Sequence, residues 1–341
     1  MIIALDAMGG DFAPASTVEG AVLAAKAAQH KIILVGDNDL ILKELSKQNN
    51  KNSLPLSINI EIVHAPEIIS MTEQHPVKAV RSKKNSSLAV CAQLVSEGKA
   101  DAFVSMGNSG AVMASAFFYL RRIRGIIRPA ITTMFPTIKG NCIVADMGAN
   151  VDCKPEHLFQ FGIMASVFCS KVIGIKRPKI ALLSIGEEPN KGNELTLATF
   201  NLFKKSIGID LDFIGNIEGK DIPTGKADVV ICDGFIGNVI LKFGEGLAGT
   251  ILYLIKQKLG YSPVKWILFP FVRLVKKTLE TKFDYSKIGG APLLGVNGVC
   301  IIGHGRSNSH AVKNAILTGA KTAQYDVIHD IEIAVNKFNY K

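Results

Sequence analysis

The sequence predicts an α/β protein with three layers, in which helices cover both faces of a largely parallel β-sheet. Short apolar runs typical of buried strands alternate with longer segments whose apolar residues recur at helical spacing. The chain has 341 residues, which is enough to bury a large core. Apolar residues make up 48% and charged residues 20% of the chain, a balance that favours a folded core over disorder.

In the first half of the chain, apolar runs predict strands at residues 1–5, 31–35, 58–63, 102–105 and 131–135. Helical periodicity predicts helices at residues 16–29, 39–47, 86–96 and 109–120. Pro76 suits the first turn of a helix, where its missing N–H costs nothing, so a short helix is expected at residues 76–81.

In the second half, residues 139–141 are predicted to form the turn between strands 131–135 and 142–146. Asn193 is a suitable N-cap for a helix at residues 195–203 because its side-chain oxygen can accept a backbone N–H bond. Further strands are expected at residues 179–185, 211–214, 228–232 and 299–303, and further helices at 156–173, 235–259 and 311–338. We expect residues 1–341 to form a single domain with an amphipathic helical insertion at about 260–283.

The net charge of +10 favours acidic partners, such as a phosphorylated substrate, an anionic membrane surface or an acidic protein. Aromatic residues make up only 7% of the chain and no basic run is interleaved with them, so no nucleic-acid partner is expected. The six cysteines form no C-x-x-C pair and no zinc pattern. We therefore expect buried thiols in a cytoplasmic protein, and no metal.

Six predicted strand ends are rich in glycine, asparagine and acidic residues. They are residues 6–11, 105–110, 146–150, 186–194, 233–238 and 303–308. Glycine lets a backbone approach a ligand closely, and a helix start attracts anions. Because the carboxyl ends of parallel strands meet at one edge of a sheet, we expect these loops to form a cradle for phosphate or an oxyanion there. For any one loop, ordinary turn chemistry is the alternative.

Standard catalytic motifs are missing or incomplete. Residues 244–249 match G-x-G-x-x-G, but no acidic residue lies about 20 positions further on to bind a ribose. Residues 219–227 resemble a phosphate-binding P-loop but have the wrong spacing, and H-E-x-x-H and G-x-S-x-G do not occur. These observations disfavour hydride transfer, nucleotide hydrolysis and a serine nucleophile.

Residues 262–279 are both apolar and basic. This stretch is too short, and too broken by Pro270, to span a bilayer. It suits a helical pair lying in a membrane interface, with Trp266, Phe269 and Phe271 as the membrane contacts. A dimer contact or a flap over the core is the alternative.

Taken together, the loops closely resemble those of the bacterial acyl-carrier-protein:phosphate acyltransferases, the PlsX family, over essentially the whole chain. The matching stretches are residues 4–11, 83–87, 107–110, 148–153, 155–157, 185–188, 191–194, 214–219, 232–239 and 304–305, with Ser307. The sequence departs from the family pattern at Met106, where a small residue is usual, and at Ser109, where threonine is common.

The resemblance implies that inorganic phosphate attacks the thioester of a long-chain acyl-carrier protein and releases acyl phosphate. It also implies a homodimer with a fold similar to isocitrate dehydrogenases and phosphotransacetylases, and no organic cofactor. The family associates peripherally with the membrane, where a glycerol-3-phosphate acyltransferase takes over the acyl group. The carrier protein is acidic, and candidates for its dock are Lys83, Lys84, Arg121, Arg122 and Arg124.

Phosphate is itself a nucleophile, so the site needs groups that hold the anion and stabilise a tetrahedral oxyanion. We expect His304 to protonate the departing thiol or hold phosphate, unless it is only a turn histidine, and Asn238 or Asn150 to donate to the oxyanion. Phosphate binding is assigned to Lys191, Gly107, Asn108, Ser109, Gly110, Gly192 and Asn193. The supporting loop residues are Asp6, Gly9, Gly10, Asp11, Glu187 and Asp233.

Three other functions stay open. A phosphotransacetylase-like enzyme would use an acyl-coenzyme A thioester instead of the carrier protein. A metal-dependent decarboxylating dehydrogenase would need converging aspartates and a nicotinamide site, and the missing ribose acid disfavours it. A peripheral membrane scaffold of lipid synthesis would leave the six glycine- and asparagine-rich loops unexplained.

Overall fold

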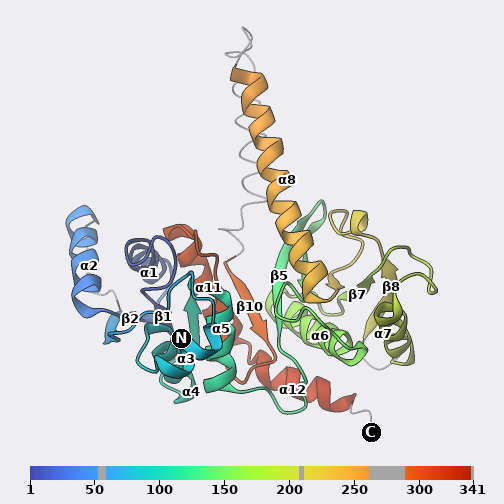
Figure 1. Cartoon of the computed structure of the whole chain (residues 1–341), viewed down its shortest axis with the longest axis horizontal. Coiled ribbons are helices and arrows are strands. Elements are labelled where there is room, and N and C mark those ends of the chain that lie inside the picture. The colour runs from blue at the N-terminus through green and yellow to red at the C-terminus, as the bar shows by residue number, and fades with distance from the viewer. Residues whose placement is uncertain (53–58, 207–210, 261–288, 339–341) are drawn as a thin grey trace.

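The computed structural model describes residues 1–52, 59–206, 211–260 and 289–338. Within these ranges, eleven strands form one sheet in the order β3–β2–β1–β4–β11–β10–β5–β6–β9–β7–β8 (Figure 1). The strands are β1 (Ile2–Asp6), β2 (Lys31–Gly36), β3 (Ile60–His64), β4 (Ala102–Ser105), β5 (Ala130–Thr137), β6 (Gly140–Ala145), β7 (Lys179–Leu183), β8 (Asp212–Ile217), β9 (Val229–Ile231), β10 (Ala291–Leu294) and β11 (Val299–Ile302).

The helices lie between these strands, as the alternating pattern predicts. The α-helices are α1 (Ala15–Ala27), α2 (Asn38–Asn52), α3 (Pro76–Ser82), α4 (Ser87–Ser96), α5 (Ser109–Ser115), α6 (Pro155–Phe168), α7 (Glu194–Lys205), α8 (Gly234–Gly260), α11 (Ser309–Gln324) and α12 (Val327–Lys337). Two π-helical turns, η1 (Ala116–Leu120) and η2 (Cys169–Ile173), continue α5 and α6, and a short 3₁₀ turn, η3 (Gly219–Asp221), follows β8. Pro76 begins α3 as predicted.

Seven of the ten pairings between the described strands are parallel, which confirms a largely parallel sheet. The other three pairings, β11–β10, β10–β5 and β5–β6, are antiparallel and adjacent. As a result, β3, β2, β1, β4 and β11 run in one direction, and β6, β9, β7 and β8 run in the opposite one. The prediction that all six loops share one edge of the sheet is therefore wrong. The predicted hairpin between β5 and β6 is confirmed, but its turn lies at residues 138–139, because Gly140 and Asn141 already belong to β6.

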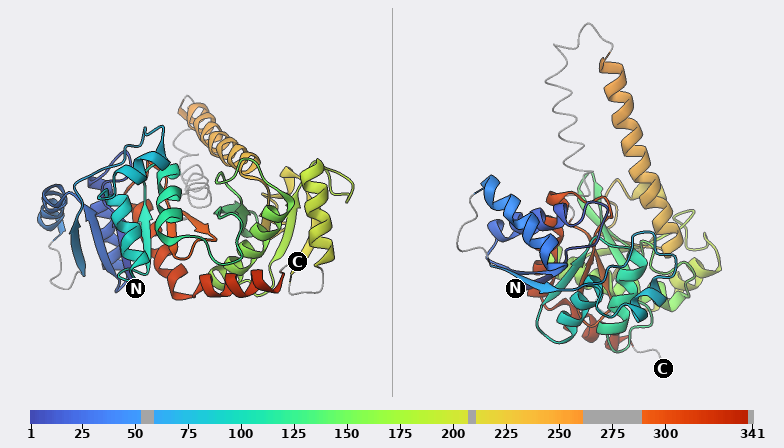
Figure 2. Two further views of the ribbon diagram at one scale, coloured as in Figure 1. Left: turned by 60° about the horizontal axis from the view of Figure 1, so that its bottom comes forward. Right: turned by 60° about the vertical axis from the view of Figure 1, so that its left-hand side comes forward.

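Helices cover both faces of the sheet, which confirms the three layers (Figures 1 and 2). In the first half, Ile3 and Leu5 of β1 pack with α1 and α11, and Ala4 between them packs with α4 on the other face. In the second half, α6, α7 and α12 cover one face, where the rings of Phe159 and Phe203 lie 4.9 Å apart. One apolar cluster contains residues of both halves and joins them.

The closing helix predicted at residues 311–338 is in fact two helices. Asp326, between α11 and α12, has a left-handed backbone with φ 46° and ψ 44°, which interrupts the helical hydrogen-bond ladder. This break lets α11 pack on the first half of the sheet while α12 packs on α6 in the second half (Figure 1). The apolar periodicity continues across the break, so the sequence pattern does not reveal it.

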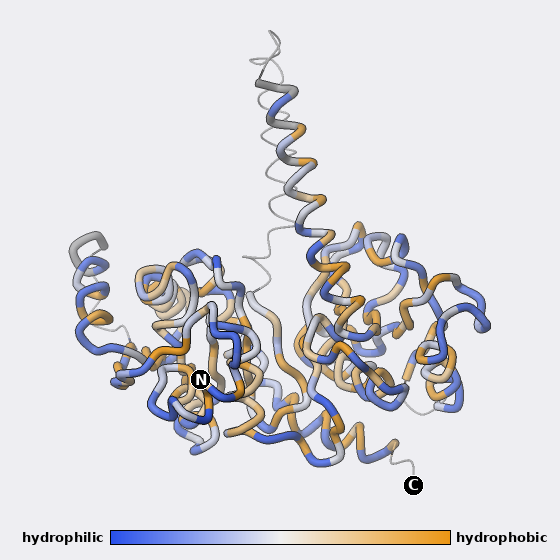
Figure 3. Tube along the Cα trace, viewed as in Figure 1, coloured by the Kyte–Doolittle hydropathy of each residue, from blue (hydrophilic) through white to orange (hydrophobic). Residues whose placement is uncertain are grey.

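Helix α8 extends well beyond the sheet (Figures 1 and 2) and carries apolar residues along its length (Figure 3). The exposed ones include Phe243, Leu247, Ile251 and Leu254. Beyond residue 260, the predicted insertion at about 260–283 lies outside the described residues, and so do Trp266, Phe269 and Phe271. In the ranges that the structure describes, no helix has both the length and the apolar character needed to cross a bilayer.

A buried carboxylate holds three chain segments together where β1 ends. Asp6 accepts hydrogen bonds from the hydroxyls of Ser87 at the start of α4 and Ser105 at the end of β4, at 2.6 and 2.7 Å. The backbone N–H of Met8 donates to it as well, at 3.2 Å. The hydroxyl of Ser105 in turn accepts the N–H of Gly107 at 3.0 Å. Burial raises the pKa of Asp6, and the bonds from Ser87 and Ser105 oppose that rise.

A second buried carboxylate, Asp146, holds chain segments together where β6 ends. It accepts the backbone N–H groups of Ile131, Ala149 and Asn150, at 2.9, 3.1 and 2.7 Å. The side-chain amide of Asn150 donates to it at 2.9 Å. Burial raises its pKa, against the opposing effect of these bonds. Asp6 and Asp146 thus each fix the loop after a strand, one in each half of the sheet.

The hydrogen bonds that Ser87 and Ser105 donate to Asp6, here called the Asp6 anchor, lead us to expect different effects from two similar substitutions. Ser87→Ala removes one donor to the carboxylate and should lower the free energy of unfolding by about 1.5–3 kcal/mol, the range for hydrogen bonds to charged groups. Ser105→Ala also removes the acceptor of the Gly107 N–H and should cost more. Because both act on one carboxylate, the double variant should deviate from additivity. Urea unfolding followed by circular dichroism measures these free energies, and equal, fully additive losses would contradict the anchor.

Candidate active site

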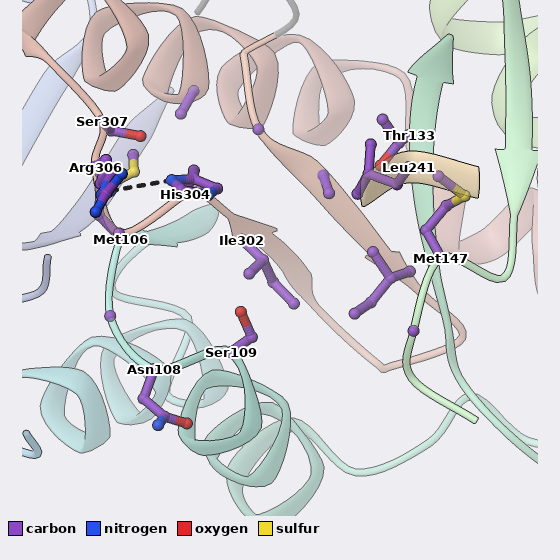
Figure 4. Close-up of a pocket in the computed structure, with 18 of the residues that line it drawn as sticks. Met106, Asn108, Ser109, Thr133, Met147, Leu241, Ile302, His304, Arg306 and Ser307 are labelled. Atoms are coloured by element: carbon purple, nitrogen blue, oxygen red, sulfur yellow. Dashed lines mark hydrogen bonds between the residues drawn. The ribbon is translucent and has the colours of Figure 1, made fainter. Parts of the chain in front are cut away.

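A cavity of about 500 Å³ lies between residues of both halves of the sheet (Figure 4). This volume is typical of a site for a small molecule. Five of the six predicted loops contribute to its lining, through Asp11, Met106, Gly107, Asn108, Ser109, Met147, Gly148, Asn238, Gly303, His304, Gly305, Arg306 and Ser307. The loops therefore converge on one cavity even though the strands that carry them run in opposite directions.

The lining contains both polar and apolar side chains. Figure 4 shows His304, Arg306 and Ser307 together, with Leu241 and Met147 across the cavity from them. The apolar lining residues are Met71, Met106, Met113, Ile131, Met147, Leu241, Ala291, Ile302, Ala311 and Ala315. Methionine is flexible and polarizable, so such a wall adapts to an apolar ligand of variable shape. The cavity can hold an anion beside an apolar chain.

The loop after β4 presents its backbone and Ser109 to the cavity. The side-chain oxygen of Asn108 accepts the N–H of Ala111 at 3.1 Å and so caps α5. Its amide nitrogen donates to the carbonyl of Met71 at 3.0 Å. Asn108 therefore positions the loop, while the hydroxyl of Ser109 is exposed. Gly110 does not line the cavity; it packs against Pro76 instead.

Two glycines after β1 allow this loop to approach the β1 loop closely. A Cβ atom on Gly9 would lie 2.9 Å from the backbone nitrogen of Gly107. Gly10 has a φ of +106°, which L side chains rarely adopt. Gly9 and Gly10 thus support the site through backbone packing, as the prediction of a supporting loop requires, and neither lines the cavity.

The loop after β11 carries the imidazole of His304. The backbone N–H of Arg306 donates to its Nδ1 at 3.1 Å (Figure 4). Since Nδ1 accepts this bond, the neutral ring carries its proton on Nε2 and is a donor there. The N–H of Asp11 donates to the Gly305 carbonyl at 2.8 Å, which ties the loop to the one after β1. His304 is therefore held in a defined orientation.

The cavity is also lined by two cationic side chains that were not predicted as site residues. Arg306 is exposed in the His304 loop, and Lys242 lies on α8, paired with Glu245 at 2.9 Å. Lys242 lies four residues after Asn238, so both occupy the same face of the helix, and both line the cavity. That spacing was a signal in the sequence. Arg306 lies inside a predicted loop but was given no role.

Several predicted site residues lie outside the lining. Asn150 donates to the Pro129 carbonyl at 2.7 Å and to Asp146, so its amide holds a loop. Asp233 accepts the Ile236 N–H at 2.9 Å at the start of α8. Neither residue contacts the cavity.

The loop after β7 does not reach the cavity either, so Lys191, Gly192 and Asn193 are not among its lining residues. Asn193 caps α7 by accepting the Thr196 N–H at 2.9 Å, which confirms the predicted cap. Glu187 pairs with Lys226 at 2.8 Å. These contacts do not test phosphate binding by Lys191, whose side chain is exposed.

The cysteines are buried, apart from the half-buried Cys153, as predicted. Burial raises the pKa of the Cys142 and Cys169 thiols to about 12. Burial also raises the pKa of Cys153 to about 12, and the charges of Asp146 and Asp233 add to this. These thiols are poor sources of a thiolate nucleophile.

Comparison with known proteins agrees with the predicted resemblance. Residues 1–330 match a family described as fatty acid synthesis protein. A phosphate acyltransferase of Endomicrobium trichonymphae is 61% identical over 341 residues, covering 100% of this chain and 99% of that protein. A phosphate acyltransferase of Pelotomaculum thermopropionicum is 47% identical over 341 residues, covering 100% of this chain and 97% of that protein.

Solved structures share the fold. A phosphotransacetylase from Streptococcus pyogenes superposes with a TM-score of 0.60 at 18% identity, covering 95% of this chain and 94% of that chain. The EutD phosphotransacetylase from Staphylococcus aureus gives a TM-score of 0.58 at 18% identity, with the same coverage. At this identity the likeness concerns the fold alone, and it confirms the predicted fold class. By its family match over residues 1–330, the chain belongs to the family described as fatty acid synthesis protein, and its full-length relatives show that it is a phosphate acyltransferase, an acyltransferase enzyme.

Proposed function

We propose that this protein transfers a long-chain fatty acyl group from acyl-carrier protein to inorganic phosphate, giving acyl phosphate for phospholipid synthesis. Its membership of the phosphate acyltransferase family supports acyl transfer to phosphate. The observation that carries the rest is the cavity itself, where Arg306 and Lys242 lie beside a wall of methionine and aliphatic side chains. One part suits a small dianion and the other suits the end of an apolar chain.

Phosphate binds between the His304 loop and α8 in this proposal. Arg306 offers a guanidinium whose geometry matches two phosphate oxygens, and Lys242 offers a compact positive charge. The exposed Ser109 adds a hydroxyl donor from the loop after β4. Holding the anion against the thioester converts a bimolecular reaction into an effectively unimolecular one, which is the main contribution such a site can make.

The reaction requires no side-chain nucleophile. A phosphate oxygen attacks the thioester carbonyl carbon, the C–S bond breaks, and the proton of hydrogen phosphate ends on the carrier thiol. Asn238 lies at the cavity and is the candidate donor to the developing oxyanion, whereas the amide of Asn150 is occupied elsewhere. His304, with its Nε2 proton, suits a hydrogen-bond donor to phosphate or to the leaving sulfur.

We further propose a cytoplasmic homodimer that associates peripherally with the membrane and passes acyl phosphate to a membrane glycerol-3-phosphate acyltransferase. The exposed apolar residues of α8 support a contact of this kind, because a projecting helix with apolar side chains such as Phe243 and Leu247 is rarely left in water. Membrane contact through Trp266, Phe269 and Phe271 remains part of this proposal.

An assay of the product tests the proposal directly. The protein, incubated with phosphate and palmitoyl-carrier protein, should form palmitoyl phosphate and release free carrier thiol in equal amounts. Palmitoyl-coenzyme A in place of the carrier protein should be a poorer donor. Better turnover with palmitoyl-coenzyme A would favour the phosphotransacetylase-like alternative. If neither donor gave any product, the hypothesis of an enzyme would be rejected, and the hypothesis of a peripheral membrane scaffold would remain.

The position of the phosphate can be tested by comparing two cations. Arg306→Gln should raise the KM for phosphate by about tenfold or more, since a charge-assisted bond to an anion is lost. Lys191→Gln, on the loop outside the cavity, serves as its matched control and should change this KM by less than about twofold. The opposite pattern would place the phosphate at the β7 loop, as the sequence analysis predicts.

A further inference from the structure

Arginine and phenylalanine side chains form an exposed patch at the far end of the helix that begins at the cavity. We define this arginine–phenylalanine patch as Arg81, Phe117, Phe118, Arg121, Arg122 and Arg124. Phe117 and Phe118 are 50% and 37% exposed, which is unusual for large aromatic side chains. Phe117 and the segment from Arg121 to Ile126 line an open groove of about 400 Å³. The patch is therefore concave in part and accessible.

Two of the four arginines of the patch contact aromatic rings. The guanidinium of Arg81 lies 4.9 Å from the centre of the Phe118 ring, and that of Arg122 lies 5.8 Å from the centre of the Phe117 ring. Arg122 also donates to the carbonyl of Ile127. Within the described ranges, no carboxylate forms an ion pair with any arginine of the patch. The patch thus presents positive charge that the chain itself does not neutralise.

The backbone beneath the patch is fixed. Arg121 has a φ of 62° and a ψ of −177°, a conformation that is costly for any residue with a side chain. It persists because the segment is bonded to the turn between β10 and β11. Asn297 N–H donates to the Arg121 carbonyl at 3.0 Å, and Ile123 N–H donates to the Gly295 carbonyl at 3.1 Å. The arginines are therefore presented by a rigid support, which lowers the entropy lost on binding.

One stripe of helix connects the patch with the cavity. Ser109 and Met113 line the cavity, and Phe117 lines the groove of the patch. These residues are spaced four apart on α5 and its continuation η1, so they lie along one side of the helix. At about 1.5 Å per residue, the stripe is about 12 Å long. A partner bound at the patch can reach the cavity with a tethered chain laid along it.

We infer that the arginine–phenylalanine patch is the docking surface for the acidic face of the carrier protein, whose tethered acyl chain enters the cavity along α5. This inference rests on the proposed function. Arginine pairs with carboxylates through two parallel hydrogen bonds, and arginine and phenylalanine are enriched in the buried centres of protein interfaces. A membrane surface is the less suitable partner, because the patch includes a groove lined by a loop, whereas an interfacial helix presents its apolar side chains along one face. Lys83, which was also a predicted dock residue, donates a hydrogen bond from Nζ to the carbonyl of Ile68 at 2.8 Å.

Charge reversal at the patch tests the inference. Arg122→Glu with Arg124→Glu should raise the KM for palmitoyl-carrier protein by at least about tenfold, and leave the KM for phosphate and the kcat at saturating carrier unchanged. Arg124→Glu alone keeps the Arg122 bond to Ile127 and should give a smaller rise in the same KM. Lys176→Glu with Arg177→Glu makes the same charge change on another exposed segment. This matched control should leave the KM within about twofold of wild type.

Direct titration of palmitoyl-carrier protein by fluorescence anisotropy separates failure of the dock from failure of the proposed function. If the wild type binds the carrier protein but the patch variants bind it equally well, the docking inference is overturned, whether or not acyl phosphate forms. If the variants lose affinity only for vesicles containing anionic lipid, the patch contacts the membrane instead. Loss of carrier binding in both patch variants, with the control unchanged, is the result we expect.

Discussion

The buried carboxylate of Asp6 is the interaction on which the arrangement of the site depends most. One side chain at the end of β1 accepts bonds from α4 and from the end of β4, and the second of these donors, Ser105, holds the Gly107 N–H of the cavity loop. Burying a charge is costly unless it is fully hydrogen-bonded, so these donors cannot move independently. Asp146 imposes the same constraint after β6. Asp6 and Asp146 thus act behind the site, through the loops that they hold.

The cavity exists because the two halves of the sheet are oppositely directed and joined. The antiparallel pairings around β10 and β5 place the loops after β4 and β11 opposite β5, the loop after β6 and the first turns of α8. Helix α12 crosses from one half to the other and packs on α6 (Figure 1). Both halves supply polar and apolar groups: the first supplies Arg306, His304 and most of the apolar side chains, and the second supplies Lys242, Asn238 and Leu241.

Local patterns in the sequence predicted most strands, helices and caps, because apolar period and capping chemistry are properties of a few neighbouring residues. Asn193 is an N-cap as predicted, but the sequence does not show that β7 lies next to the edge of the sheet, away from the cavity. Strand β10, only four residues long, gave no signal of its own. The split between α11 and α12 was hidden because one left-handed residue, Asp326, leaves the apolar period intact. The order and direction of the strands in the sheet, which depend on residues far apart in the sequence, determine which loops meet.

In the proposed mechanism, a tetrahedral anion binds between the His304 loop and α8. A crystal structure with arsenate, a phosphate analogue with a strong anomalous signal, tests this most directly. We predict one anomalous peak within hydrogen-bonding distance of the Arg306 guanidinium and the Lys242 ammonium, inside the cavity lined by Ser109 and His304. A peak at the β7 loop beside Lys191, with an empty cavity, would contradict the account.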